Sequence, residues 1–130
     1  MPLTALHHVQ VACPRDGEDA ARAFYADGLG LVEVEKPADL RARGGAWFRA
    51  YGDRGDVLAE LHVGVEEPFI PARKAHPAFV VDDLDAVAAR LRAGGFEVDE
   101  RERTTFEGHL RFHAFDPHGN RVEVLERSAT

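Results

Sequence analysis

The spacing between apolar residues changes within the first third of the chain, and the change indicates a strand followed by a helix. The segment His8-Val9-Gln10-Val11 alternates polar and apolar residues, which is typical of a strand with one buried face. A helix capped by Asp16 is predicted next, because apolar residues then recur every three to four positions. Its apolar residues and the glycines that end it are Ala20, Phe24, Tyr25, Gly28 and Gly30.

Period-two alternation returns after this helix and predicts three more strands, over residues 31–34, 47–51 and 57–63. The last two strands are joined by Gly52-Asp53-Arg54-Gly55, whose residue types favour a tight turn. The first half of the chain therefore has the order βαβββ.

The second half repeats this order. A strand around His76 is followed by a helix capped by Asp82 or Asp83, and Gly94-Gly95 ends the helix. The apolar face of this helix is formed by Leu84, Val87, Ala88 and Leu91. The last hairpin turns at Asp116-Pro117-His118-Gly119-Asn120. One module is predicted at about residues 4–65 and the other at about 75–127, with a linker at about 66–74.

Superposing the two modules places a histidine on a histidine and a glutamate on a glutamate. His8 aligns with His76 on the first strand of each module, and Glu60 aligns with Glu123 on the last strand. Side chains alternate along a strand, so His8 and Gln10 are expected on the face opposite Val9 and Val11. Each sheet is therefore predicted to have an apolar face under its helix and a concave face that carries His and Glu.

Composition narrows the class of protein. The 130 residues, 45% of them hydrophobic, are enough for one domain with a single core. The net charge of −7 disfavours nucleic acid as a partner, and no run of about 18 apolar residues predicts a membrane span. The N-terminus lacks the regions of a signal peptide, and the lone Cys13 suits a reducing compartment. A soluble cytoplasmic protein is expected.

Nearly the whole chain resembles the vicinal oxygen chelate superfamily, which includes glyoxalase I, fosfomycin-modifying enzymes, methylmalonyl-CoA epimerase, extradiol dioxygenases and bleomycin-resistance proteins. The segments that carry the resemblance are LHHVQVA, RAFYADGLGL, HPAFVVDDLDAVAARLRAGG and FDPHGNRVEVLE. The resemblance implies an α+β fold in which two repeated βαβββ modules form an eight-stranded, incomplete barrel with flanking helices. It also implies a homodimer. The sequence leaves open whether the cleft is completed within one chain or across the dimer.

Carried over by position, the metal ligands of the superfamily would be His8, Glu60, His76 and Glu123. Imidazole and carboxylate ligands suit a divalent ion such as Zn, Ni, Co, Mn or Fe, and Glu123 or Glu60 would also move a proton. His62, two residues after Glu60, is a competing ligand or a hydrogen-bond donor to one. Further candidates for the substrate pocket are Gln10, Trp47, Arg49, His62, Arg111 and His113.

Three functions are compatible with this resemblance, because the superfamily shares a scaffold and not a reaction. The first is a metal-dependent lyase, isomerase or transferase of the glyoxalase type that acts on a small oxygenated, chelating substrate. The second is a non-catalytic protein of the bleomycin-resistance type that binds an antibiotic or another small molecule. The third is an Fe(II) dioxygenase, which the additional carboxylate Glu60 disfavours because extradiol enzymes use two histidines and one carboxylate.

Overall fold

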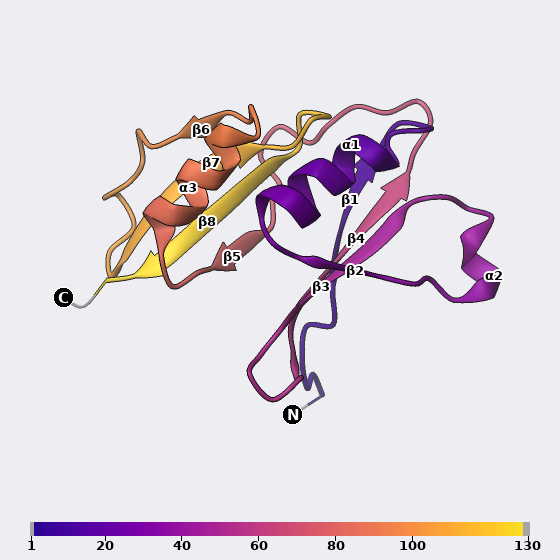
Figure 1. The fold of residues 1–130 in the computed structure, drawn as a ribbon, viewed down its shortest axis with the longest axis horizontal. Helices are drawn as coiled ribbons and strands as arrows, with labels where there is room; N and C mark the ends of the chain where they lie inside the picture. Colours follow the sequence, from indigo (N-terminus) through magenta and orange to yellow (C-terminus); the bar gives the residue numbers. More distant parts are fainter. Residues whose placement is uncertain (1, 129–130) are drawn as a thin grey trace.

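The computed structural model describes residues 2–128 and contains two four-stranded sheets, one for each predicted module (Figure 1). The first sheet has the order β1-β4-β3-β2 and contains β1 (Val9–Cys13), β2 (Val32–Val34), β3 (Ala46–Tyr51) and β4 (Val57–Val65). The second has the order β5-β8-β7-β6 and contains β5 (Ala78–Val80), β6 (Val98–Asp99), β7 (His109–Phe115) and β8 (Arg121–Arg127). In both sheets the first strand pairs parallel with the last, so the repeat seen in the sequence is also a repeat of topology. The two sheets are separate, and the barrel is open, as predicted.

The helices cover one face of each sheet. In the first module α1 (Glu18–Arg22) continues into the π-helical segment η1 (Ala23–Gly28), and in the second module α3 (Leu84–Ala93) takes the same place (Figure 1). The two helical segments contact each other, and Nε of Arg90 donates to the carbonyl oxygen of Asp27 at 2.7 Å. The large side chains buried in the core are Phe24, Tyr25, Phe48, Leu61, Leu84, Leu91, Phe112, Val122 and Val124. No helix within residues 2–128 is long and apolar enough to cross a membrane.

The predicted helix cap is correct in the second module and wrong in the first. Asp83 caps α3, and its carboxylate accepts a hydrogen bond from the backbone N–H of Ala86 at 3.1 Å. The first helix instead begins after Gly17, without a side-chain cap. Asp16 has a φ of 64°, a left-handed conformation outside the extended region that an N-cap residue normally adopts.

One short element was not predicted. A single helical turn, α2 (Ala38–Arg41), lies between β2 and β3 and is too short to show a hydrophobic period. The predicted second strand of module two is present as β6, which is only two residues long. The linker at residues 66–74 contains no helix or strand, as predicted.

The turn between β7 and β8 joins the two modules. Oδ1 of the buried Asp116 accepts hydrogen bonds from the backbone N–H groups of His118, at 2.9 Å, and Asn120, at 3.0 Å. Its Oδ2 accepts from the Tyr25 hydroxyl at 2.7 Å and from Nδ2 of Asn120 at 2.8 Å. Nδ2 of Asn120 also donates to the carbonyl oxygen of Ala12 on β1 at 2.7 Å. Through these bonds the turn of module two is attached to the helix and first strand of module one.

Candidate metal centre

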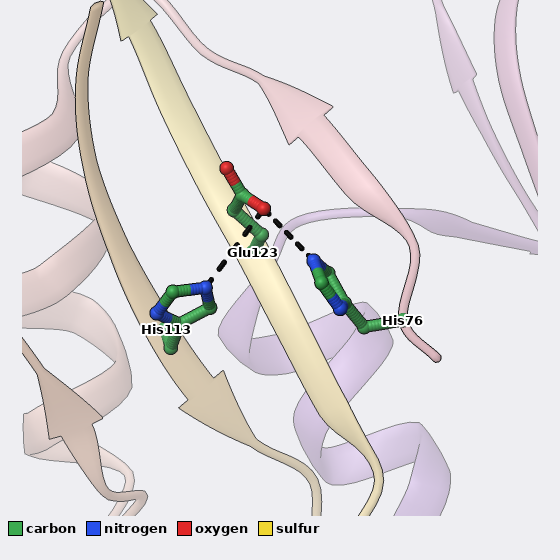
Figure 2. A group of neighbouring side chains, drawn as sticks. All are labelled: His76, His113 and Glu123. Atoms are coloured by element: carbon green, nitrogen blue, oxygen red, sulfur yellow. Dashed lines mark hydrogen bonds and ion pairs between the residues drawn. The ribbon is translucent and has the colours of Figure 1, made fainter. Parts of the chain in front are cut away.

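Two histidines and one glutamate meet on the second sheet, on the face opposite α3 (Figure 2). Glu123 lies on β8 and is paired across the sheet with His113 on β7. Phe112, Ala114, Val122 and Val124 belong to the core, so the alternation along both strands turns His113 and Glu123 away from it. His76 precedes β5, which is the other neighbour of β8. The cluster therefore depends on strand pairing between segments far apart in the sequence.

Hydrogen bonding of His76 leaves one ring nitrogen directed at Glu123. Nδ1 of His76 lies 2.6 Å from the carbonyl oxygen of Lys74, and because a carbonyl can only accept, this nitrogen carries a proton. Nε2 lies 2.8 Å from Oε1 of Glu123. A contact this short between an imidazole nitrogen and a carboxylate oxygen needs either a second proton or a cation between them. A histidine that ligates a metal usually donates its other N–H to a carbonyl or carboxylate in the same way.

The charge states of Glu123 and His113 favour binding of a cation. Burial raises the pKa of Glu123, but hydrogen bonds from His76 and Arg111 outweigh it and lower the pKa overall. Burial lowers the pKa of His113, and the charges of Arg111 and Arg121 add to that effect against the opposing charge of Glu123. At neutral pH the site thus holds an ionised carboxylate and a neutral imidazole, which are the forms that bind metals.

The donor atoms fit a divalent ion. Two ligand atoms each about 2.1 Å from a metal are about 3.0–3.4 Å apart at octahedral or tetrahedral angles. The separation of His76 and Glu123 is close to this range, and Nε2 of His113 lies 3.8 Å from the same Oε1. Within residues 2–128 this is the one group of three His, Cys, Asp or Glu side chains whose ligand atoms all lie within 4.8 Å of one another.

Glu60 and His62 form a different cluster on the first sheet. Nε2 of His62 lies 2.6 Å from Oε2 of Glu60, and Nε of Arg49 donates to Oε1 at 2.7 Å. Only 7% of Glu60 and 5% of His62 is exposed, so each needs these partners. Burial raises the pKa of Glu60, but the hydrogen bonds from His62 and Arg49 lower it overall, and burial lowers the pKa of His62. Both carboxylate oxygens are therefore already engaged by protein groups.

Three rings stack beside this carboxylate. The imidazole of His62 lies between the indole of Trp47 and the imidazole of His8, with ring centroids 4.0 Å away on each side. The interplanar angles are 3° and 16°. Gln10 is the register partner of His62 on β1 and has an exposed side chain, so it lies at the edge of the same surface. The predicted pocket candidates of module one thus share one face.

The structure divides the four predicted ligands between two clusters. His76 and Glu123 lie together and are joined by His113, which was predicted only as a pocket residue. His8 and Glu60 are on the first sheet with His62. Metal binding by any of these side chains stays a prediction.

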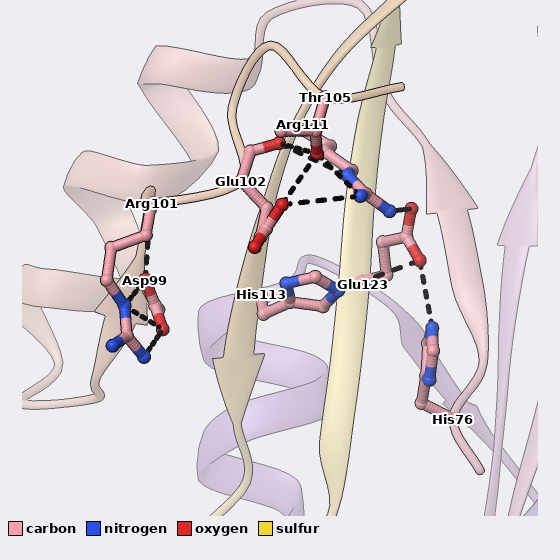
Figure 3. A network of polar contacts seen from close by, with 8 residues as sticks. All are labelled: His76, Asp99, Arg101, Glu102, Thr105, Arg111, His113 and Glu123. Carbon is pink, nitrogen blue, oxygen red and sulfur yellow. Dashed lines mark hydrogen bonds and ion pairs between the residues drawn. The ribbon is translucent and has the colours of Figure 1, made fainter. Parts of the chain in front are cut away.

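A cavity of about 610 Å³ opens beside the histidines of module two, and its lining is rich in positive charge. Arg111 contacts Glu123, with Nη1 3.3 Å from Oε2, and also donates through Nη2 to the Thr105 hydroxyl at 2.8 Å (Figure 3). Three more cations line the cavity, Lys74, Arg101 and Arg121. Arg121 was not predicted as a site residue, although its place two residues before Glu123 on one strand puts both side chains on the same face.

Comparison with known proteins identifies the family. The family model for the Glyoxalase/Bleomycin resistance protein/Dioxygenase superfamily matches residues 5–124. A structure from Bacillus anthracis assigned to the glyoxalase family is 40% identical, with a TM-score of 0.85 over 97% of each chain. No curated protein matches the sequence.

More distant structures share the fold. FosX, a fosfomycin resistance protein from Listeria monocytogenes, was solved as a mutant complexed with Mn(II) and 1S,2S-dihydroxypropylphosphonic acid. It is 17% identical to this chain, with a TM-score of 0.74 over 98% of this chain and 95% of that one. TnmS3, an antibiotic binding protein from Streptomyces sp. CB03234, is 23% identical, with a TM-score of 0.66 over 97% of this chain and 100% of that one. The family model and the 40% identical relative together show that this chain belongs to the Glyoxalase/Bleomycin resistance protein/Dioxygenase superfamily.

Proposed function

We propose that the protein is a metal-dependent enzyme of the glyoxalase type, with His76 and Glu123 as metal ligands. The observation that carries this proposal is the hydrogen bond from Nδ1 of His76 to the carbonyl of Lys74, which aims Nε2 at Glu123. When bound, a divalent ion would polarise adjacent oxygen atoms of a small chelating substrate. Its identity among Zn, Ni, Co, Mn and Fe is left open, and FosX, with the same fold, was solved with Mn(II).

We propose further that His8 reaches this centre from a second copy of the chain. Within one chain His8 stacks on His62 and belongs to the other cluster. A hollow lined by His8 and Glu60 is also lined by the exposed apolar side chains of Leu6, Val57 and Leu58, which a second copy would cover. In a two-fold dimer each contact occurs twice, so two equivalent centres would form. Glu60 is less suited to be a ligand, because Arg49 and His62 occupy its oxygens.

The proton-transfer step would involve a side chain beside the metal. Glu123 and Glu60 were the candidates from the sequence, but the pKa of each is lowered, which makes both weak bases. A neutral imidazole has an ordinary pKa of about 6.5, well above that of a carboxylate. Burial lowers the pKa of His113 and so keeps its imidazole neutral and able to accept a proton, and Arg111 would hold Glu123 in its ligating orientation.

A second candidate is favoured by the composition of the cluster itself. His76, His113 and Glu123 are two histidines and one carboxylate, the set that non-haem Fe(II) oxygenases use with open positions for substrate and oxygen. This assignment needs His113 as a ligand in place of His8. The two functions thus differ in the role of one residue, and substitution of His113 separates them.

The stack of Trp47, His62 and His8 favours a third reading, a protein that only binds a ligand. Its face offers aromatic surface to a planar molecule, and Glu60 is satisfied there without a metal. A ligand bound with the same affinity before and after chelator treatment would support this reading.

Metal analysis of the purified protein tests the leading proposal. After reconstitution with Mn²⁺ or Zn²⁺ and removal of excess ion, the wild type should retain about one ion per chain. His76→Ala and Glu123→Ala should lose it, whereas His109→Ala, which removes a half-buried histidine from outside the cluster on the same sheet, should not. Equal retention by all four proteins would exclude this centre.

A further inference from the structure

Positive charge gathers in the cavity of module two, although the protein is acidic. The chain has a net charge of −7, yet the cavity is lined by four basic side chains, Lys74, Arg101, Arg111 and Arg121, and by two acidic ones, Asp99 and Glu102. Figure 3 shows Arg101 beside Asp99 and Arg111 reaching toward Glu123. A concave surface with this balance concentrates anions near it.

Two of these cations are engaged by acidic neighbours. Nε of Arg101 lies 3.0 Å from both oxygens of Asp99. Arg111 lies between Glu123, at 3.3 Å, and Glu102, at 3.9 Å. These pairs neutralise much of the charge that Arg101 and Arg111 bring to the cavity.

Lys74 and Arg121 have no acidic partner within 4.0 Å among the residues that the structure describes. Nε of Arg121 is buried and has no hydrogen-bond partner there. A buried guanidinium nitrogen without an acceptor is rare in folded proteins, since the lost hydration is not replaced. Arg121 shares the face of β8 with Glu123, and its charge acts on His113. Arg121 also lines the cavity, so an anion bound there would supply the counter-charge that its guanidinium lacks.

We infer that Lys74 and Arg121 form an oxyanion subsite beside the metal centre, and that the substrate is a small molecule carrying a phosphate, phosphonate or carboxylate group. The inference rests on the proposed function in one respect, because only an enzyme would bind this anion as part of a substrate. The carbonyl of Lys74 orients His76, while its side chain lines the cavity, so one residue connects the metal centre to the subsite. Arg offers several N–H groups in one plane to an oxyanion, and Lys adds a point charge.

Titration calorimetry of the full-length protein with inorganic phosphate, methylphosphonate and acetate tests the subsite. Both chelator-treated and Mn²⁺-loaded protein are titrated, which separates this site from direct metal coordination. The wild type should bind all three anions in the chelator-treated form, the two multiply charged ones more tightly than acetate. Arg121→Gln and Lys74→Gln should each weaken phosphate binding by about tenfold, the size expected for loss of one charged hydrogen bond.

Matched controls remove the same charge nearby. Arg73→Gln lies next to Lys74, and Arg127→Gln lies on the strand of Arg121; neither side chain lines the cavity. Both should bind phosphate as the wild type does. If the controls lose as much phosphate affinity as Arg121→Gln does, the effect comes from the general loss of positive charge. That result would overturn the subsite. Absence of phosphate binding to the chelator-treated wild type, or tighter binding of acetate than of phosphate, would also overturn it.

The same proteins distinguish this inference from the proposed function. Mn²⁺ affinity should be unchanged in Arg121→Gln. If no variant or wild type binds metal but phosphate binding depends on Arg121 and Lys74, the subsite stands and the metalloenzyme does not. If metal binds as proposed and phosphate affinity is the same in the wild type, Arg121→Gln and Lys74→Gln, the metal centre stands and the subsite is wrong.

Discussion

Nε2 of His76 lies 2.8 Å from Oε1 of Glu123, across 47 positions of sequence. Pairing of β5 with β8 brings the two segments together, and the carbonyl of Lys74 sets the direction of the imidazole. The preorganised geometry means that a metal would replace a proton without a large rearrangement.

Glu60 and Glu123 should differ in their effect on metal affinity, although they occupy equivalent positions in the repeat. Glu123→Ala removes a proposed ligand and should weaken Mn²⁺ binding by at least about tenfold. Glu60→Ala should weaken it by less than about threefold, because both oxygens of Glu60 are held by Arg49 and His62. Calorimetric titration of both variants measures the difference. Similar losses would show that Glu60 is a ligand of the same centre.

Mixing two inactive variants should restore metal sites if the ligands come from two chains. In a mixed dimer of His8→Ala and Glu123→Ala subunits, one centre has both ligands intact and the other lacks both. After subunit exchange, about a quarter of all sites should bind Mn²⁺ with wild-type affinity. Each variant alone should have none. No recovery in a mixture shown to contain mixed dimers would place His8 outside the centre of its partner.

Substitution of Asp116 should destabilise the fold strongly, since this carboxylate accepts from two backbone N–H groups, Tyr25 and Asn120. Asp116→Ala should reduce the free energy of unfolding by about 3 kcal/mol. Tyr25→Phe removes a single hydrogen bond and should cost about 1 kcal/mol. Urea denaturation measures both, and equal effects would mean that the hydroxyl, and not the turn, dominates.

Stability should fall as the pH drops from about 7.5 to 5.5. Burial lowers the pKa of His62 and of His113, so in this range the unfolded chain, whose histidines titrate near pH 6.5, binds more protons than the folded one. The stabilisation is present above the unfolded pKa and is lost as the pH falls toward the folded pKa. The lowered pKa of Glu60 and Glu123 acts in the same direction at more acidic pH.

His62→Gln should flatten this pH dependence, and the control His109→Gln, at a half-buried histidine outside both clusters, should leave it unchanged. Urea unfolding at pH 7.5 and at pH 5.5 gives the two free energies needed for each protein. An identical slope in wild type and His62→Gln would show that the imidazole in the ring stack does not contribute.

The repeat made the fold predictable, because strand alternation and helix spacing occur twice in the same order. It also predicted that His76 and Glu123 share a face. The sequence could not show that His113 joins them, since this depends on the register of β7 against β8. Nor could it separate His8 and Glu60 from that centre, because the placement of one module against the other is a tertiary property. Asp16 was expected as a cap by residue type alone, and its left-handed backbone overrides that preference.

An anomalous difference map from crystals of the Mn²⁺-loaded protein tests the central claim most directly. The account predicts one peak per chain within about 2.3 Å of both Nε2 of His76 and Oε1 of Glu123, with His8 of a second copy completing the set. A peak that also contacts His113 and not His8 would favour the Fe(II) oxygenase assignment. A map without a peak between His76 and Glu123, from protein that binds Mn²⁺ in solution, would contradict the metal centre proposed for this chain.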